Sequence, residues 1–174
     1  GWMRSRCSPC CRLCGITIRK ERGMSRLSRL QRLTEYLAGL RIKSGKYPDG
    51  IDPICTTAQS DATSKLAHLS GVQVLLARPE VHQRGDSDTF REELGTVIFV
   101  LEKGLGLDKT EESENGQYSR LLEIADLILA YIAEETSGQN CRLVTGLSLA
   151  SVDVVPEASV FGGWSGYSIE LAFE

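Results

Sequence analysis

The sequence has few of the residues on which enzymes and membrane proteins depend. No run of apolar residues approaches the roughly 18 that a membrane-spanning helix needs, which excludes such a helix. Only two histidines occur, His68 and His82, and neither has a serine, cysteine or acidic partner at a suggestive spacing. The chain has no HExxH or GxGxxG motif and no Ser/His/Asp order, so we expect neither an enzyme nor a cofactor.

Cysteine is scarce outside one stretch, CSPCCRLC at residues 7–14, which contains Cys7, Cys10, Cys11 and Cys14. Zinc sites usually join two cysteine pairs from separated places in the chain, whereas nothing separates these two C-x2-C pairs. Disulfides need an oxidising compartment, and the preceding GWMRSR contains no apolar segment typical of a secretion signal. We therefore expect no metal site here.

Residues 1–23 show no hydrophobic period, whereas a well-patterned helix begins after Met24. The RKERG that precedes Met24 can be written in purine-rich codons, as a bacterial ribosome-binding site would be. We expect residues 1–23 to be a non-native leader or a disordered tail, and residues 24–174 to form one domain. The alternative is a metal-binding or redox tail, so whether the four cysteines belong to the functional protein stays open at this stage.

Positive charge is concentrated at one end of the chain. Residues 1–43 contain eleven Lys/Arg against two Glu, whereas the remainder contains nine against 21 acidic residues. Leucines at spacings of three and four predict an amphipathic helix over residues 25–40, which Ser25 would cap. Beside this apolar stripe lie Arg26, Arg29 and Arg32. They form either a solvated face or a surface that meets DNA or an acidic partner, and the absence of interleaved aromatics argues against sequence-specific binding.

The middle of the chain predicts strands followed by a long helix. GVQVLLA (71–77) and ELGTVIFVLEKG (93–104) are apolar runs typical of strands, the second central in a sheet. QYSRLLEIADLILAYIAEE (117–135) predicts a helix that Asn115 caps and that packs on this sheet. Polar connections are expected at 44–70, with a short strand near Ile54, and at 81–92 and 104–116. We expect the helix and sheet to bury Val97, Phe99, Leu121, Ile128, Ile169 and Leu171.

The last third of the chain predicts two strands. The first covers 141–157, and a glycine-rich bend with an aromatic anchor, FGGWSG, follows it. In the second, Tyr167, Ile169, Leu171 and Phe173 alternate with smaller or charged residues. The whole order predicts an α+β fold: a small, mostly antiparallel sheet with one long helix packed on it and an N-terminal amphipathic helix.

The closing segment SVDVVPEASVFGGWSGYSIELAFE (151–174) also carries a family resemblance. Its form VxVVPE … FGGWSGYSIEL resembles the closing hairpin of tail-terminator, tail-completion and neck (head–tail joining) proteins of tailed bacteriophages and prophages. The order of elements over residues 24–174 is similar to theirs.

The resemblance implies a structural component of the virion, a ring-forming tail-completion or head–tail joining protein assembled in the cytoplasm of a bacterial host. Its implied partners are further copies of itself, other phage tail or neck proteins and non-specific DNA, with no membrane. The polar connections 81–92 and 104–116 would then be contact loops. The alternative function is a small nucleic-acid-binding or regulatory protein that uses the basic helix at residues 25–40.

Overall fold

The computed structural model describes residues 26–44, 47–85, 91–106, 109–137 and 149–174. The cysteine stretch and the expected leader at residues 1–23 therefore lie outside the described residues, as does Ser25. Along the chain the elements are α1 (Arg26–Ala38), β1 (Ile42–Ser44), β2 (Tyr47–Ile51), β3 (Ile54–Thr56), α2 (Gln59–Leu66), β4 (Val72–Ala77), β5 (Glu80–Arg84), β6 (Arg91–Lys103), α3 (Glu111–Ser137), β7 (Leu149–Val160) and β8 (Trp164–Phe173).

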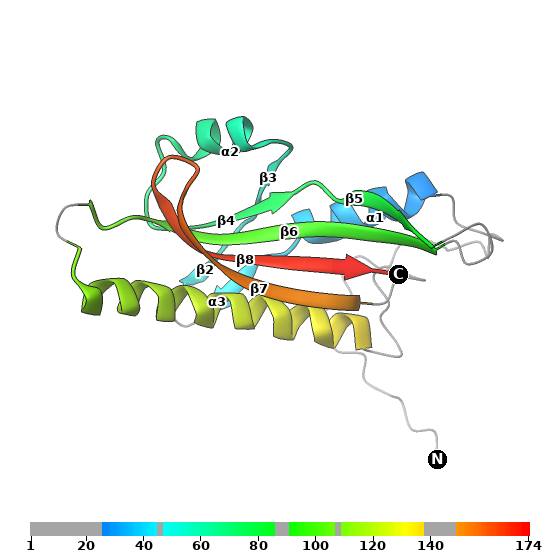
Figure 1. Ribbon diagram of the computed structural model, residues 1–174. Coiled ribbons are helices and arrows are strands. Elements are labelled where there is room, and N and C mark those ends of the chain that lie inside the picture. Colours follow the sequence, from blue (N-terminus) through cyan, green and yellow to red (C-terminus); the bar gives the residue numbers. More distant parts are fainter. Residues whose placement is uncertain (1–25, 45–46, 86–90, 107–108, 138–148) are drawn as a thin grey trace, which may run out of the picture.

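Strand β6 is the long central strand of the main sheet and pairs with other strands along both of its edges. On one edge it meets first β5 and then β4, and on the other it meets β8 from Leu94 to Lys103. The order across the sheet is β3-β4-β6-β8-β7, with β5 also beside β6. Among the strands that the structure describes, only β3 and β4 pair in parallel. The predicted α+β fold, with a mostly antiparallel sheet, one long helix on it and an N-terminal helix, is confirmed (Figure 1).

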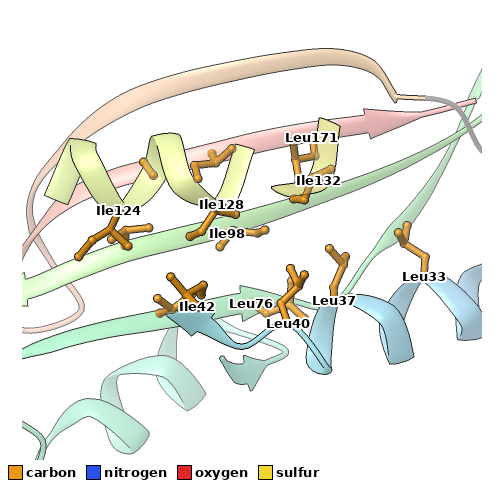
Figure 2. Close-up of a cluster of buried hydrophobic side chains, with 14 of the residues drawn as sticks. Leu33, Leu37, Leu40, Ile42, Leu76, Ile98, Ile124, Ile128, Ile132 and Leu171 are labelled. Atoms are coloured by element: carbon orange, nitrogen blue, oxygen red, sulfur yellow. The ribbon is translucent and has the colours of Figure 1, made fainter. Parts of the chain in front are cut away.

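The two longer helices, α1 and α3, cover the same face of this sheet. Their apolar residues recur every three or four positions, so each helix presents one continuous stripe to the strands. Figure 2 shows the stripes meeting the strands in one cluster, and its labelled members are Leu33, Leu37, Leu40, Ile42, Leu76, Ile98, Ile124, Ile128, Ile132 and Leu171. Burial of such side chains contributes about 1.5–3 kcal/mol each, so this cluster is the main source of stability.

The opposite face carries a second, smaller cluster under α2. It consists of Ala62, Leu66, Leu75, Leu101 and Trp164, with Phe99 and Phe161 packed against it. The rings of Phe99 and Phe161 meet edge to face, with their centroids 5.1 Å apart.

The predicted placement of Phe99 and Val97 beneath the long helix is wrong. Both are only partly buried, and Phe99 packs with the α2 cluster on the other face. Neighbouring side chains of a strand point to opposite faces, and it is Ile98 and Val100 that point to α3. The run TVIFVL is apolar at every position but its threonine, so its pattern could not show which face each side chain takes. Leu121, Ile128, Ile169 and Leu171 are buried as predicted.

The closing hairpin is present as predicted, but its bend is shorter than the predicted FGGWSG, because β8 begins at Trp164. Tyr167, Ile169 and Phe173 of β8 all belong to, or pack against, the α1–α3 cluster. The bend between β7 and β8 contains Gly162 and Gly163, whose φ angles of 84° and 102° favour glycine. Trp164, the next residue, is 2% exposed. Two residues after Trp164, Gly166 faces β6 so closely that a Cβ atom would collide with the Val100 carbonyl oxygen.

Helix α3 begins earlier than predicted, so Asn115 is not its cap. Thr110 caps it instead: its Oγ1 accepts a hydrogen bond from the Ser113 backbone N–H (3.2 Å), and its own N–H donates to Ser113 Oγ (2.9 Å). The second half of the acidic loop expected at 104–116 is thus the start of α3, where Glu111, Glu112 and Glu114 lie near the positive end of the helix dipole.

Two other expected loops contain regular structure. Of the described residues in the connection predicted at 81–92, all but Gly85 are strand, because β5 occupies its start and β6 begins at Arg91. The connection at 44–70 contains the short strand expected near Ile54, but also β2 and the helix α2. Polar side chains on exposed strand and helix surfaces account for both errors. No helix within the described ranges is long and apolar enough to cross a membrane.

Candidate functional site

The predicted arginine stripe on α1 does not form one uniform surface. Arg29 turns toward the sheet, and its Nη2 lies 3.4 Å from Glu92 Oε1 of β6, with the two side chains only 26% and 13% exposed. Arg32 is partly exposed and makes no ion pair with a described residue. The side chain of Arg26 lies outside the described part of the structure. Arg29 therefore anchors α1 to the sheet, and Arg32 is left as the stripe's candidate for contact with a partner.

The edge of the sheet formed by β7, together with the neighbouring helix α3, is strongly acidic. Apart from Arg120, every charged residue in the sequences of α3 and β7 is Asp or Glu. The two elements are joined at Glu157, whose carbonyl oxygen accepts a 2.7 Å hydrogen bond from Tyr118 Oη. Leu122 and Asp126 follow Tyr118 at intervals of four, so they lie on the same side of α3 as this bond. We call α3 together with β7 the acidic flank.

Strand β7 presents an edge that the described chain does not cover. It pairs with β8 alone, and its residues 150–156 are all exposed. Three valines are among them: Val152 at 37%, Val154 at 36% and Val155 at 41%. An exposed, partly apolar edge strand is a ready template for pairing with another chain.

The position of Pro156 shows which backbone N–H and C=O groups of β7 point away from β8. It lies opposite Tyr167, and because proline has no N–H this position cannot be a mutually hydrogen-bonded pair. In an antiparallel ladder the two kinds of pair alternate, and the register is regular from Ser151 to Glu157. The N–H and C=O groups of Val152 and Val154 therefore also point outward. Another strand can therefore pair with this edge as far as Pro156, which has no N–H to donate to it.

The edge of the sheet at β5 differs from the β7 edge in charge. Strand β5 pairs with β6 alone in the described chain, its own His82 is exposed, and Arg78 just before it is exposed as well. Helix α1 lies close by, because Arg29 contacts Glu92 and Glu92 is opposite Gln83 of β5. We call α1 together with Arg78 and β5 the arginine flank, although Glu35 of α1 and Glu80 of β5 are also part of it. The two flanks lie at opposite edges of one sheet.

A shallow depression lies on the sheet face that α1 and α3 leave uncovered. The side chains that line it and carry charge or can acquire one are Arg78, Glu80, His82, Glu93, Asp153 and Glu170. His82 Nε2 lies 3.9 Å from Glu80 Oε2, beyond hydrogen-bonding distance. A nucleophile paired with a base is needed for covalent catalysis, and the lining residues include none. Within the described ranges, no group of His, Cys, Asp and Glu is arranged to hold a metal ion.

The titration behaviour of Asp61 has a local structural cause. Lys65 Nζ donates a 2.9 Å hydrogen bond to Asp61 Oδ2, and the Thr57 backbone N–H donates to the same oxygen at 3.2 Å. Both donors favour the charged carboxylate, so the pKa of Asp61 lies below its ordinary value. Lys65 Nζ also donates a hydrogen bond to the Cys55 carbonyl oxygen (2.6 Å), so the Lys65 side chain links α2 to β3.

The exposed valines of β7 are the feature that the sequence analysis missed. A strand was predicted over 141–157, whose first part lies outside the described residues, but it was not recognised as an edge strand. Pro156 was the available signal, because proline within a strand is largely confined to edges and bulges.

No protein-family model matches the chain, and no curated protein matches it significantly.

Proposed function

We propose that the chain is a structural component of a tailed bacteriophage or prophage particle. It would form a ring at the end of the tail or at the head–tail joint, in contact with other tail or neck proteins. The proposal comes from the resemblance of residues 151–174 to closing hairpins of such proteins. The α+β architecture, with a helix at the start and a hairpin at the end, is compatible with it.

The observation that carries the proposal is the difference between the two flanks of the sheet. A ring arises when one surface of a subunit binds a different surface of the next, so each subunit needs two unlike, complementary patches. The acidic flank and the arginine flank are unlike in charge and lie at opposite edges. The depression between them lacks a catalytic pair, which favours a binding role over an enzymatic one.

Deletion of the gene from the parent phage or prophage tests this function. Particles that lack the protein should accumulate as heads and tails that are not joined, or as tails of abnormal length, and wild-type protein supplied in trans should restore infectivity. Normal joined particles with undiminished infectivity would show that the protein has no structural role in the virion.

The nucleic-acid-binding alternative depends on the α1 arginines. Arg29 is engaged by Glu92, so Arg32 carries most of what the described part of this stripe offers to a phosphate backbone. Titration of the full chain with duplex DNA at increasing salt separates the two functions. A DNA-binding protein should bind tightly at low salt and lose affinity steeply as counterions compete, and Arg32→Ala should reduce the slope of that dependence by about one.

A further inference from the structure

We infer that the open β7 edge of one copy binds the β5 edge of a second copy, so that the sheet continues from subunit to subunit. The inference rests on the proposed function, because it names the surfaces through which the ring would form. It depends on three properties of the described residues: the open backbone of β7, the direction of β5, and the charges beside each edge.

The backbone of β7 supplies both donors and acceptors to such a contact. The outward N–H and C=O groups of Val152 and Val154 form a short row with the spacing of a sheet ladder. Pro156 confines pairing to the residues before it, a stretch from Leu149 to Val155 that is comparable in length to the five residues of β5. This limit gives the contact a defined register, since slippage toward the hairpin would oppose a partner to the proline.

Strand directions suit a second copy in the same orientation. Strands β5 and β6, β6 and β8, and β8 and β7 are all antiparallel pairs, so β5 runs antiparallel to β7 within one subunit. A neighbour displaced sideways without being turned over therefore brings its β5 antiparallel to β7. The joined sheet keeps one face for α1 and α3 throughout, so that α3 of one copy lies toward α1 of the next.

Charge favours this contact over a symmetric one. Pairing of β7 with β7 would bring Asp153 and Glu157 of two copies together, along with the acidic surfaces of both α3 helices, and like charges on adjacent strands are destabilising. Pairing with β5 instead brings one acidic residue, Glu80, to the contact and places the acidic flank beside Arg32 and Arg78 of the neighbour. The exposed side chains of Val152, Val154 and Leu122 add apolar area to the contact.

The test removes the outward N–H of β7 without changing its pairing to β8. Val154→Pro does this. The fold should tolerate proline at position 154 because the backbone N–H there, as at Pro156, points away from β8. Val154→Thr is the matched control, since threonine keeps the N–H and the β-branched shape. Self-association of the full chain is measured by sedimentation velocity at low salt, and thermal melting checks that both variants fold. Val154→Pro should weaken association about tenfold or more through loss of the ladder bond and steric conflict, whereas Val154→Thr should change it by less than about threefold.

A photo-crosslinker at position 152 identifies the partner surface. Adducts that map to residues 78–84 or to α1 of a second copy are expected. Adducts within β7 would establish the symmetric pairing instead, and adducts elsewhere would overturn the β5 assignment. Equal association of Val154→Pro and wild type, or a wild-type chain that stays monomeric at every concentration, would also overturn the inference.

The phage experiment separates this inference from the proposed function. If deletion leaves the particles normal while Val154→Pro still abolishes association, the contact stands and the virion function falls. If deletion prevents joining of heads and tails but Val154→Pro complements fully, the function stands and the β7 contact falls.

Discussion

Strands β7 and β8 are neighbours in one hairpin, yet they have opposite surroundings. Both contain alternating apolar residues, but β8 is buried almost throughout and β7 is exposed along nearly its whole length. Val154 and Ile169 illustrate the contrast, because they are direct cross-strand partners and are 36% and 0% exposed. Apolar content therefore shows that a segment is a strand but not that its own subunit covers it. The valines left exposed in β7 are the part of the chain best suited to another subunit.

The largest effect is expected where β8 enters the core. Ile169→Ala should destabilise the protein by about 2–5 kcal/mol, since it removes buried methylene groups and leaves a cavity between the sheet and α3. Its partner supplies the control: Val154→Ala should cost less than about 1 kcal/mol, because the valine is partly solvated already. Chemical denaturation measures both. Equal costs at the two positions would mean that β7 is covered as well as β8 is.

A smaller effect is expected where β7 is attached to the rest of the molecule. Tyr118→Phe removes the hydrogen bond from the phenol to the Glu157 carbonyl but keeps the ring, which packs edge to face on Tyr167. The expected cost is about 0.5–1.5 kcal/mol, the net value of one hydrogen bond. Amide hydrogen exchange should quicken in β7 more than in β8. Uniform quickening of both strands would show that the hairpin opens as one unit.

The smallest effect is expected far from both strands, at Asp61. Because the folded-state pKa of Asp61 lies below its ordinary value, the charged group stabilises the fold at pH values above that ordinary value. This contribution declines as the pH falls through the folded-state pKa. Asp61→Asn should therefore melt slightly below wild type at neutral pH, and the two melting temperatures should converge in acid. A difference that persists unchanged at low pH would assign the effect to something other than the carboxylate charge.

The parts of the fold that could be predicted are those with a single apolar period. The α3 stripe, the alternation from Tyr167 to Phe173 and the glycine bend before Trp164 each had one physical interpretation, and each was right. The run from Thr96 to Leu101 was nearly apolar on both faces, so its strand was predicted but the faces of Val97 and Phe99 were not. The polar segments β5 and α2 were mistaken for loops, because a strand or helix with mostly polar side chains shows no clear apolar period in the sequence.

The candidate site was less predictable than the fold. The charge asymmetry was evident in the sequence, but the engagement of Arg29 by Glu92 requires the three-dimensional position of β6. The open edge of β7 likewise depends on which strand lies beside it, and sequence order does not reveal that the hairpin forms the border of the sheet.

Charge-reversed chains, alone and mixed, test the central claim that the two flanks of different copies bind each other. One variant reverses the acidic flank (Asp126→Lys and Asp153→Lys), and the other reverses the arginine flank (Arg32→Glu and Arg78→Glu). In low salt, where surface charges are weakly screened, each variant alone should associate less than wild type, because its altered flank meets a like charge. An equal mixture should regain association, since each altered flank then finds an altered complement on the other chain. Sedimentation of the mixture as separate monomers, while wild type assembles, would contradict the account.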